Sequence, residues 1–114
     1  MEKSKVYFTN FRAKPDRNIL QKLRHLIEAA GMTSMPLDGK FTAVKIHFGE
    51  PGNLAFLRPN YAKVVVDTLK DMGARPFLTD CNTLYTGMRR NALDHLSAAF
   101  ENGFTPLQTG CHVI

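Results

Sequence analysis

Lys45 and His47 alternate with apolar residues in the stretch 44–48, and both side chains can do chemistry at neutral pH. In a β-strand, alternate side chains point to opposite faces, so these two share a face and lie roughly 7 Å apart. A lysine there can hold a phosphate or a carboxylate as a point charge, and a histidine can transfer protons or bind a metal. The structural alternative is that both are hydrogen-bonded to Glu50 or Asp80. Because a lysine and a histidine on a covered sheet face each need a partner or a ligand, we favour a ligand site.

Further polar residues follow the ends of the predicted strands, where open α/β sheets bind their ligands. Asp80 ends a strand and can bind a metal or a hydroxyl, or cap its own loop through an Asx-turn. The loop 49–52, Gly-Glu-Pro-Gly, can wrap an anion with backbone N–H groups, although it matches neither the P-loop nor the GxGxxG fingerprint. The candidate residues are His47 and Asp80 for proton transfer, Lys45, Arg58, Asn82, Thr83 and Tyr85 for ligand binding, and His47, Glu50 and Asp80 for a metal.

The spacing of apolar residues predicts strands that alternate with helices. The expected elements are a strand at 6–8, a helix at 19–30, a strand at 41–48, a helix at 58–72, a strand at 76–80, a helix at 91–102 and a strand-like segment at 107–114. This βαβαβαβ order is typical of a mostly parallel sheet with helices on both faces, a three-layer αβα fold. On the last helix we expect Leu93, Leu96 and Phe100 to face inward, and Asp94 and His95 to form a solvated pair.

The 114 residues are enough for one domain with a single core, so we expect one α/β module over 1–114. The net charge of +5 favours an anionic partner, but Lys and Arg are spread along the chain, which is not typical of nucleic-acid binding. Cys81 and Cys111 form no metal-binding pattern and suit a reducing compartment. The sequence has no apolar run long enough for a membrane and no signal-peptide pattern, so the expected location is the cytoplasm, away from membranes. Because residues 112–114 stop inside an apolar strand, we expect an incomplete part of a larger domain, with an edge that a homodimer could cover.

Several linked motifs along essentially the whole chain resemble one family. They are Val44-Lys-Ile-His-Phe-Gly-Glu-Pro-Gly-Asn-Leu54, Arg58-Pro-Asn-Tyr61, Phe77-Leu-Thr-Asp80, Asn82-Thr-Leu-Tyr85, Asn91-Ala92 with Asp94-His95, and Glu101-Asn-Gly-Phe104. Together they resemble domain-of-unknown-function family 362 of bacteria and archaea. The resemblance implies a longer iron–sulfur, ferredoxin-like protein whose four-iron (4Fe-4S) clusters bind cysteine motifs downstream of this region. This chain lacks those cysteines, so the resemblance implies clusters for a missing downstream region and no cofactor within the chain.

Three functions follow from these observations, and whether the chain is an enzyme stays open. The leading hypothesis is an N-terminal α/β module of a redox protein that binds a small anionic ligand or a metal at the strand ends. The second is a scaffold module without a ligand, which positions the ferredoxin part against a redox partner protein. The third is a metal-dependent enzyme acting on a small carboxylate. It rests on a more distant similarity of the strand-end histidines to the nickel-pincer lactate racemase group.

Overall fold

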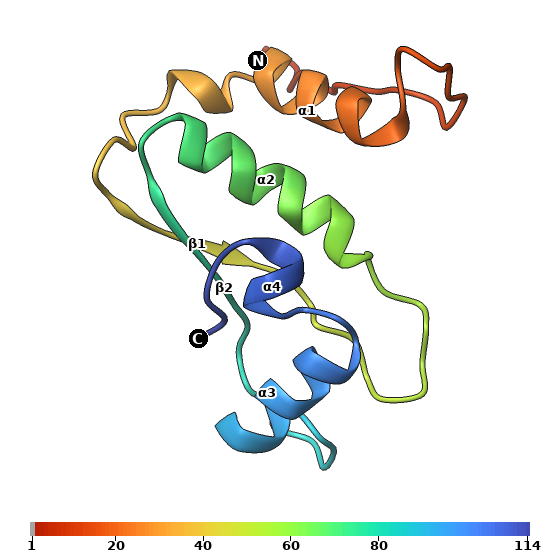
Figure 1. The fold of residues 1–114 in the computed structure, drawn as a ribbon, viewed down its shortest axis with the longest axis vertical. Coiled ribbons are helices and arrows are strands. Elements are labelled where there is room, and N and C mark those ends of the chain that lie inside the picture. The colour runs from red at the N-terminus through yellow and green to blue at the C-terminus, as the bar shows by residue number, and fades with distance from the viewer. Residues whose placement is uncertain (1) are drawn as a thin grey trace.

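The computed structural model describes residues 2–114 of the chain (Figure 1). The elements in chain order are helix α1 (Ile19–Ala29), the 3₁₀ helix η1 (Met32–Ser34), strand β1 (Phe41–Lys45), helix α2 (Pro59–Asp71), strand β2 (Arg75–Thr79), helix α3 (Ala92–Glu101) and the short helix α4 (Pro106–Thr109). In Figure 1, α1 and α2 lie side by side, while α3 lies near the ends of the two strands.

Strands β1 and β2 form a parallel pair, and α2 is the crossover between them. The pairing ends with Lys45 opposite Thr79, and the next residue, Ile46, still donates its N–H to the carbonyl oxygen of Thr79 at 3.1 Å. On the other side of β2, Leu78 forms a parallel bridge to Val113. This combination of a small parallel sheet with helices confirms the predicted α/β class.

Local signals in the sequence begin and end the three longer helices. α1 starts with a capping box, in which the Asn18 side chain accepts from the Gln21 N–H and the Gln21 side chain accepts from the Asn18 N–H. Pro59 stands in the first turn of α2, where a missing N–H costs nothing, and Gly73 follows its end with a φ of 79°. The Asn91 side chain caps α3. The three predicted helices are therefore confirmed, with each end within one residue of its predicted position.

The core is built where α2, β2 and α3 meet. Its fully buried side chains include Val66 of α2, Leu78 of β2 and Ala99 of α3, packed with Phe48 and Phe104 from the loops. Phe48 lies three residues after the end of β1, so its burial fixes the backbone of the loop that carries the predicted site. The same packing holds the carboxyl ends of both strands in place.

The inward face of α3 differs from the prediction. Leu93 is 80% exposed and Phe100 is 49% exposed, whereas His95, Ala98 and Ala99 are buried. Small alanine side chains let the helix approach the core closely, and this contact outweighs the preference of larger apolar residues for burial. The expectation of an inward Leu93 and Phe100 was wrong for that reason.

Two predicted strands are absent from the part of the chain that the structure describes. Val6 and Phe8 are 87% and 84% exposed and pair with no strand in residues 2–114. The Lys22 ammonium donates to the carbonyl oxygens of Asn10 and Arg12 at 3.0 and 2.7 Å and so holds the residues that follow this segment against α1. The three-layer βαβαβαβ order is thus not confirmed.

The predicted strand-like segment 107–114 begins as helix α4 instead. Thr105 caps this helix by accepting from the Gln108 N–H, and Pro106 occupies its first turn. Only the last residues are extended, where Leu78 donates to the carbonyl oxygen of His112 and accepts from the Ile114 N–H. Among residues 2–114, no helix has both the length and the apolar character needed to cross a membrane.

Candidate functional site

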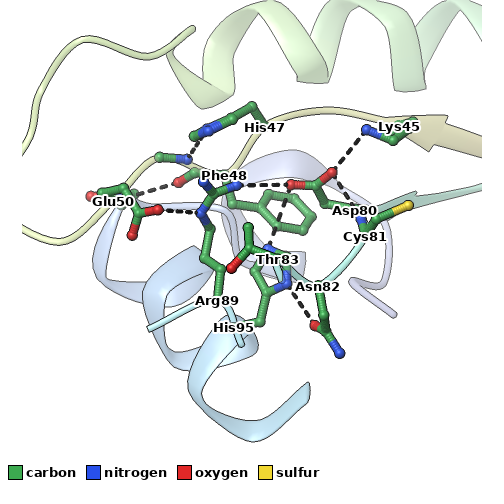
Figure 2. Close-up of polar contacts among 12 residues, drawn as sticks. Lys45, His47, Phe48, Glu50, Asp80, Cys81, Asn82, Thr83, Arg89 and His95 are labelled. Carbon is green, nitrogen blue, oxygen red and sulfur yellow. Dashed lines mark hydrogen bonds and ion pairs between the residues drawn. The ribbon is translucent and has the colours of Figure 1, made fainter. Parts of the chain in front are cut away.

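Asp80 lies at the centre of a polar cluster beyond the carboxyl ends of β1 and β2 (Figure 2). Its Oδ1 accepts from Lys45 Nζ at 3.0 Å and from the Cys81 N–H at 2.9 Å. Its Oδ2 lies 3.5 Å from both Arg89 Nη1 and His95 Nε2, and its side chain is only 5% exposed. Burial alone would raise the pKa of Asp80, but the hydrogen bonds from Lys45 and Cys81 outweigh burial and lower it. Asp80 is therefore ionised at neutral pH.

Arg89 connects this carboxylate to Glu50 in the loop after β1. Its Nε lies 2.7 Å from Glu50 Oε1, and its Nη2 donates to the hydroxyl of Tyr85. The Tyr85 hydroxyl also lies 3.4 Å from Glu50 Oε1. The Arg89 side chain is 5% exposed, so its charge has to be balanced within the protein. Two carboxylates supply that balance, which makes Glu50 and Asp80 the counterions of a buried guanidinium.

His95 completes the cluster from α3. Its Nδ1 lies 2.9 Å from Asn82 Oδ1, and its ring packs edge-on against Phe48 with centroids 5.7 Å apart. Burial lowers the pKa of His95, and although Asp80 opposes this effect, the net direction is downward. The neutral ring that donates from Nδ1 to Asn82 leaves Nε2 as a bare acceptor near Asp80. Within residues 2–114, Nε2 has no hydrogen-bond partner.

The predicted solvated pair of Asp94 and His95 is therefore wrong. Only Asp94 is exposed, where it accepts from Asn91 at the start of α3. His95 is 5% exposed because it shares the buried face with Ala98 and Ala99. Sequence spacing contained this signal, since 95, 98 and 99 recur at helical intervals.

His47 is held differently, by its own loop. Its Nδ1 accepts from the Gly49 N–H at 2.9 Å, so the neutral ring carries its proton on Nε2. An Nε2–H group donates a hydrogen bond and offers no lone pair to a metal. Gly49 makes this turn with a φ of 81°, and the carbonyl oxygen of the preceding Phe48 accepts from Asn102 at 2.8 Å.

The structure brings some predicted site residues together and leaves others apart. Lys45 and Asp80 are in contact, Glu50 and Tyr85 join them through Arg89, and Asn82 joins through His95. Thr83 makes only local bonds in its loop, and Arg58 is the N-cap residue of α2 without a capping side-chain bond. Over residues 2–114, no three His, Cys, Asp or Glu side chains gather as a metal-holding group, and this includes the predicted set of His47, Glu50 and Asp80.

Sequence reasoning did not predict the burial of Arg89 and His95. Arg89 precedes α3 in a loop of Gly, Met and Arg residues, a composition that predicts a solvated side chain. Arg89 is buried because it contacts Asp80 and also Glu50, which lies 39 positions earlier in the chain. No local sequence pattern encodes such contacts.

Comparison with known proteins gives one result. A family model described as a domain of unknown function (DUF362) matches residues 42–114, the part of the chain that contains β1 except its first residue, β2 and the whole polar cluster. No curated protein and no solved structure matches the chain significantly.

Proposed function

We propose, from the premise that this chain belongs to the DUF362 family, that it binds a small anion through Lys45 and His47 at the end of β1. One observation carries the proposal. His47 accepts from the Gly49 N–H through Nδ1, which leaves its Nε2–H free to donate, and this exposed histidine lies two residues after the exposed Lys45 that ends β1. An ammonium and an imidazole N–H are two donors suited to a carboxylate or phosphate.

Lys45 is free to turn toward a ligand. Its side chain is 64% exposed, and exposed ion pairs contribute little to stability. The hydrogen bond to Asp80 raises the pKa of Lys45, so the ammonium stays charged across the neutral range. Asp80 keeps the Cys81 N–H, Arg89 and His95 as neighbours when Lys45 moves away. The exchange of Asp80 for an external anion therefore leaves no isolated buried charge.

The less exposed residues of the polar cluster hold the loops next to the proposed anion site in position. Arg89 pairs with both Glu50 and Asp80 and so joins the loop after β1 to the loop after β2. Lys45 on Asp80 supplies the second positive charge that balances the two carboxylates. Because Asp80 and Arg89 are buried and the partly exposed Glu50 is engaged with Arg89, we assign all three to positioning, not to contact with the ligand. The proposal is one of binding and assigns no reaction.

The resemblance adds a wider setting to this proposal. In it, the chain is the N-terminal module of a cytoplasmic iron–sulfur protein, with clusters bound by cysteines outside residues 1–114, and a redox partner docks on the assembled protein. The wider proposal also includes the three-layer αβα order for the complete domain and a homodimer that covers the open edge of this part. A scaffold role is the second candidate, because the largely buried ion-pair network also serves to hold β1, β2 and α3 in fixed positions.

Titration calorimetry and NMR with inorganic phosphate and with acetate test the binding proposal. We expect Lys45→Met and His47→Gln each to weaken binding of the preferred anion at least fivefold. Lys63→Met and His25→Gln are the matched controls, because Lys63 is likewise an exposed partner of a carboxylate, at 2.8 Å from Asp67, and His25 is an exposed histidine. Equal affinities in all four variants, or no binding to the wild type, would overturn the proposal in favour of the scaffold.

A further inference from the structure

A cavity of about 480 Å³ opens beside the anion site, between α1, α2 and β1. Its walls include Leu23 and Leu26 of α1, Tyr61 and Val65 of α2, and Val44 and Lys45 of β1. Apart from Lys45 and a few loop atoms the surface is apolar. The volume lies within the range of small-molecule sites, roughly 300–1,000 Å³, and such sites often form between helices.

The cavity exists because α1 does not close onto the sheet. None of the α1 residues is fully buried, although their apolar side chains recur along one face. Lys22 donates to Asn10 and Arg12 and ties the preceding segment to α1, so that Thr9, Asn10 and Phe11 form the rim of the cavity. The segment around Asn10 that borders the cavity is therefore held in place by Lys22.

Lys45 belongs both to this cavity and to the polar cluster. It lines the cavity and donates to Asp80 from its Nζ. Val44 and Ile46 also line the cavity, so the Lys45 side chain leaves β1 toward the other face and its ammonium lies on Asp80. Because this side chain is 64% exposed, the ammonium can turn to the mouth of the cavity when it leaves Asp80. An apolar chamber with such a lysine at its border complements a molecule with an apolar body and a single negative head.

We propose that the ligand is an amphipathic carboxylate whose head group binds Lys45 and whose apolar body fills the cavity. This inference rests on the proposed function, which supplies the binding site for the negatively charged head group. It adds that the rest of the ligand is apolar and occupies the cavity. A body of several methylene groups or one aromatic ring is the size that such a chamber holds.

The test compares acetate, octanoate and octanol as probes of head, whole molecule and body. We expect the full chain to bind octanoate at least tenfold more tightly than acetate or octanol, with shifts in the methyl resonances of Leu23, Leu26 and Val65. Val65→Trp and Leu26→Trp fill the cavity from different helices, and each is expected to weaken octanoate binding at least tenfold while acetate binding stays unchanged. Lys45→Met is expected to reduce octanoate binding to the level of octanol.

The outcomes separate this inference from the proposed function. If octanoate binds no better than acetate, or binds without shifting those methyl resonances, the proposal that the cavity holds the apolar body is wrong. The proposed anion site is unaffected by that result. Octanoate binding that is insensitive to Lys45→Met overturns the assignment of the head group. If one tryptophan variant fails to fold, the other variant and the wild-type methyl shifts still decide.

Discussion

Replacing Gly49 by alanine should destabilise the protein more than the same change at Gly52. Both glycines lie in the loop after β1 and have nearly equal positive φ values of 81° and 82°. They differ in their surroundings. A Cβ atom at Gly49 would lie 2.6 Å from Asn102 Nδ2 and 2.7 Å from Phe56 Cδ1, whereas at Gly52 it would meet no described atom within 4 Å.

The size of the effect follows from two contributions. An alanine with positive φ costs about 1 kcal/mol at either position. Overlap with a packed ring and with the side chain that donates to Phe48 adds about 1–3 kcal/mol at Gly49 alone. We therefore expect the free energy of unfolding to fall by about 1 kcal/mol for Gly52→Ala and by about 2–4 kcal/mol for Gly49→Ala.

Urea unfolding followed by circular dichroism measures both values under one set of conditions. A change in midpoint without a change in slope shows that the denatured state is unaffected. A Gly49→Ala variant within about 0.5 kcal/mol of Gly52→Ala would refute the reasoning, because the close approach of Phe56 and Asn102 would then carry no cost.

Three further predictions concern charge and thiol chemistry. Asp80→Asn should lower the free energy of unfolding by about 3 kcal/mol, because it removes a counterion of the buried Arg89 guanidinium. The control Asp67→Asn removes a carboxylate from an exposed pair and should change the free energy of unfolding by less than about 1 kcal/mol. Urea unfolding curves that coincide for the two variants would contradict this prediction. Burial lowers the pKa of His95 in the folded state, so stability should fall as the pH drops below about 6.5, the usual pKa of an unfolded histidine, and melts of His95→Gln from pH 7.5 to 5 should be flatter than those of the wild type. Cys81 is exposed while Cys111 is buried with a raised thiol pKa, so Ellman's reagent should label one thiol quickly and the second only after unfolding; rapid labelling of two thiols in the native protein would be inconsistent with the structure.

Helices and paired strands were predictable because their determinants are local. The apolar repeat between Ile19 and Ala29, the proline that opens α2 and the glycine that follows it all act over one or two turns. β1 and β2 were expected from their apolar character, although regular pairing in β1 stops at Lys45, three residues earlier than predicted. The segment 6–8 has the composition of a strand, but a strand also needs a neighbour, and composition alone does not provide one.

The site was predictable where it depended on strand ends and not where it depended on tertiary packing. The contact between Lys45 and Asp80 follows from parallel strands that end side by side. The burial of His95 and Arg89 depends instead on how α3 and its preceding loop fold back over Phe48. Those contacts link positions far apart in the chain, and a reading of single segments treats both residues as solvated.

The pairing of β1 with β2 has a consequence for the order in which the chain folds. In a parallel register every pair closes a loop of the same length, and here α2 forms inside that loop and shortens the distance to be closed. We expect the β1–α2–β2 unit to be largely formed in the folding transition state, with α3 docking later. Val66→Ala should then slow refolding, whereas Ala99→Gly in α3 should mainly speed unfolding, and the reverse pattern in stopped-flow kinetics would place the folding nucleus elsewhere.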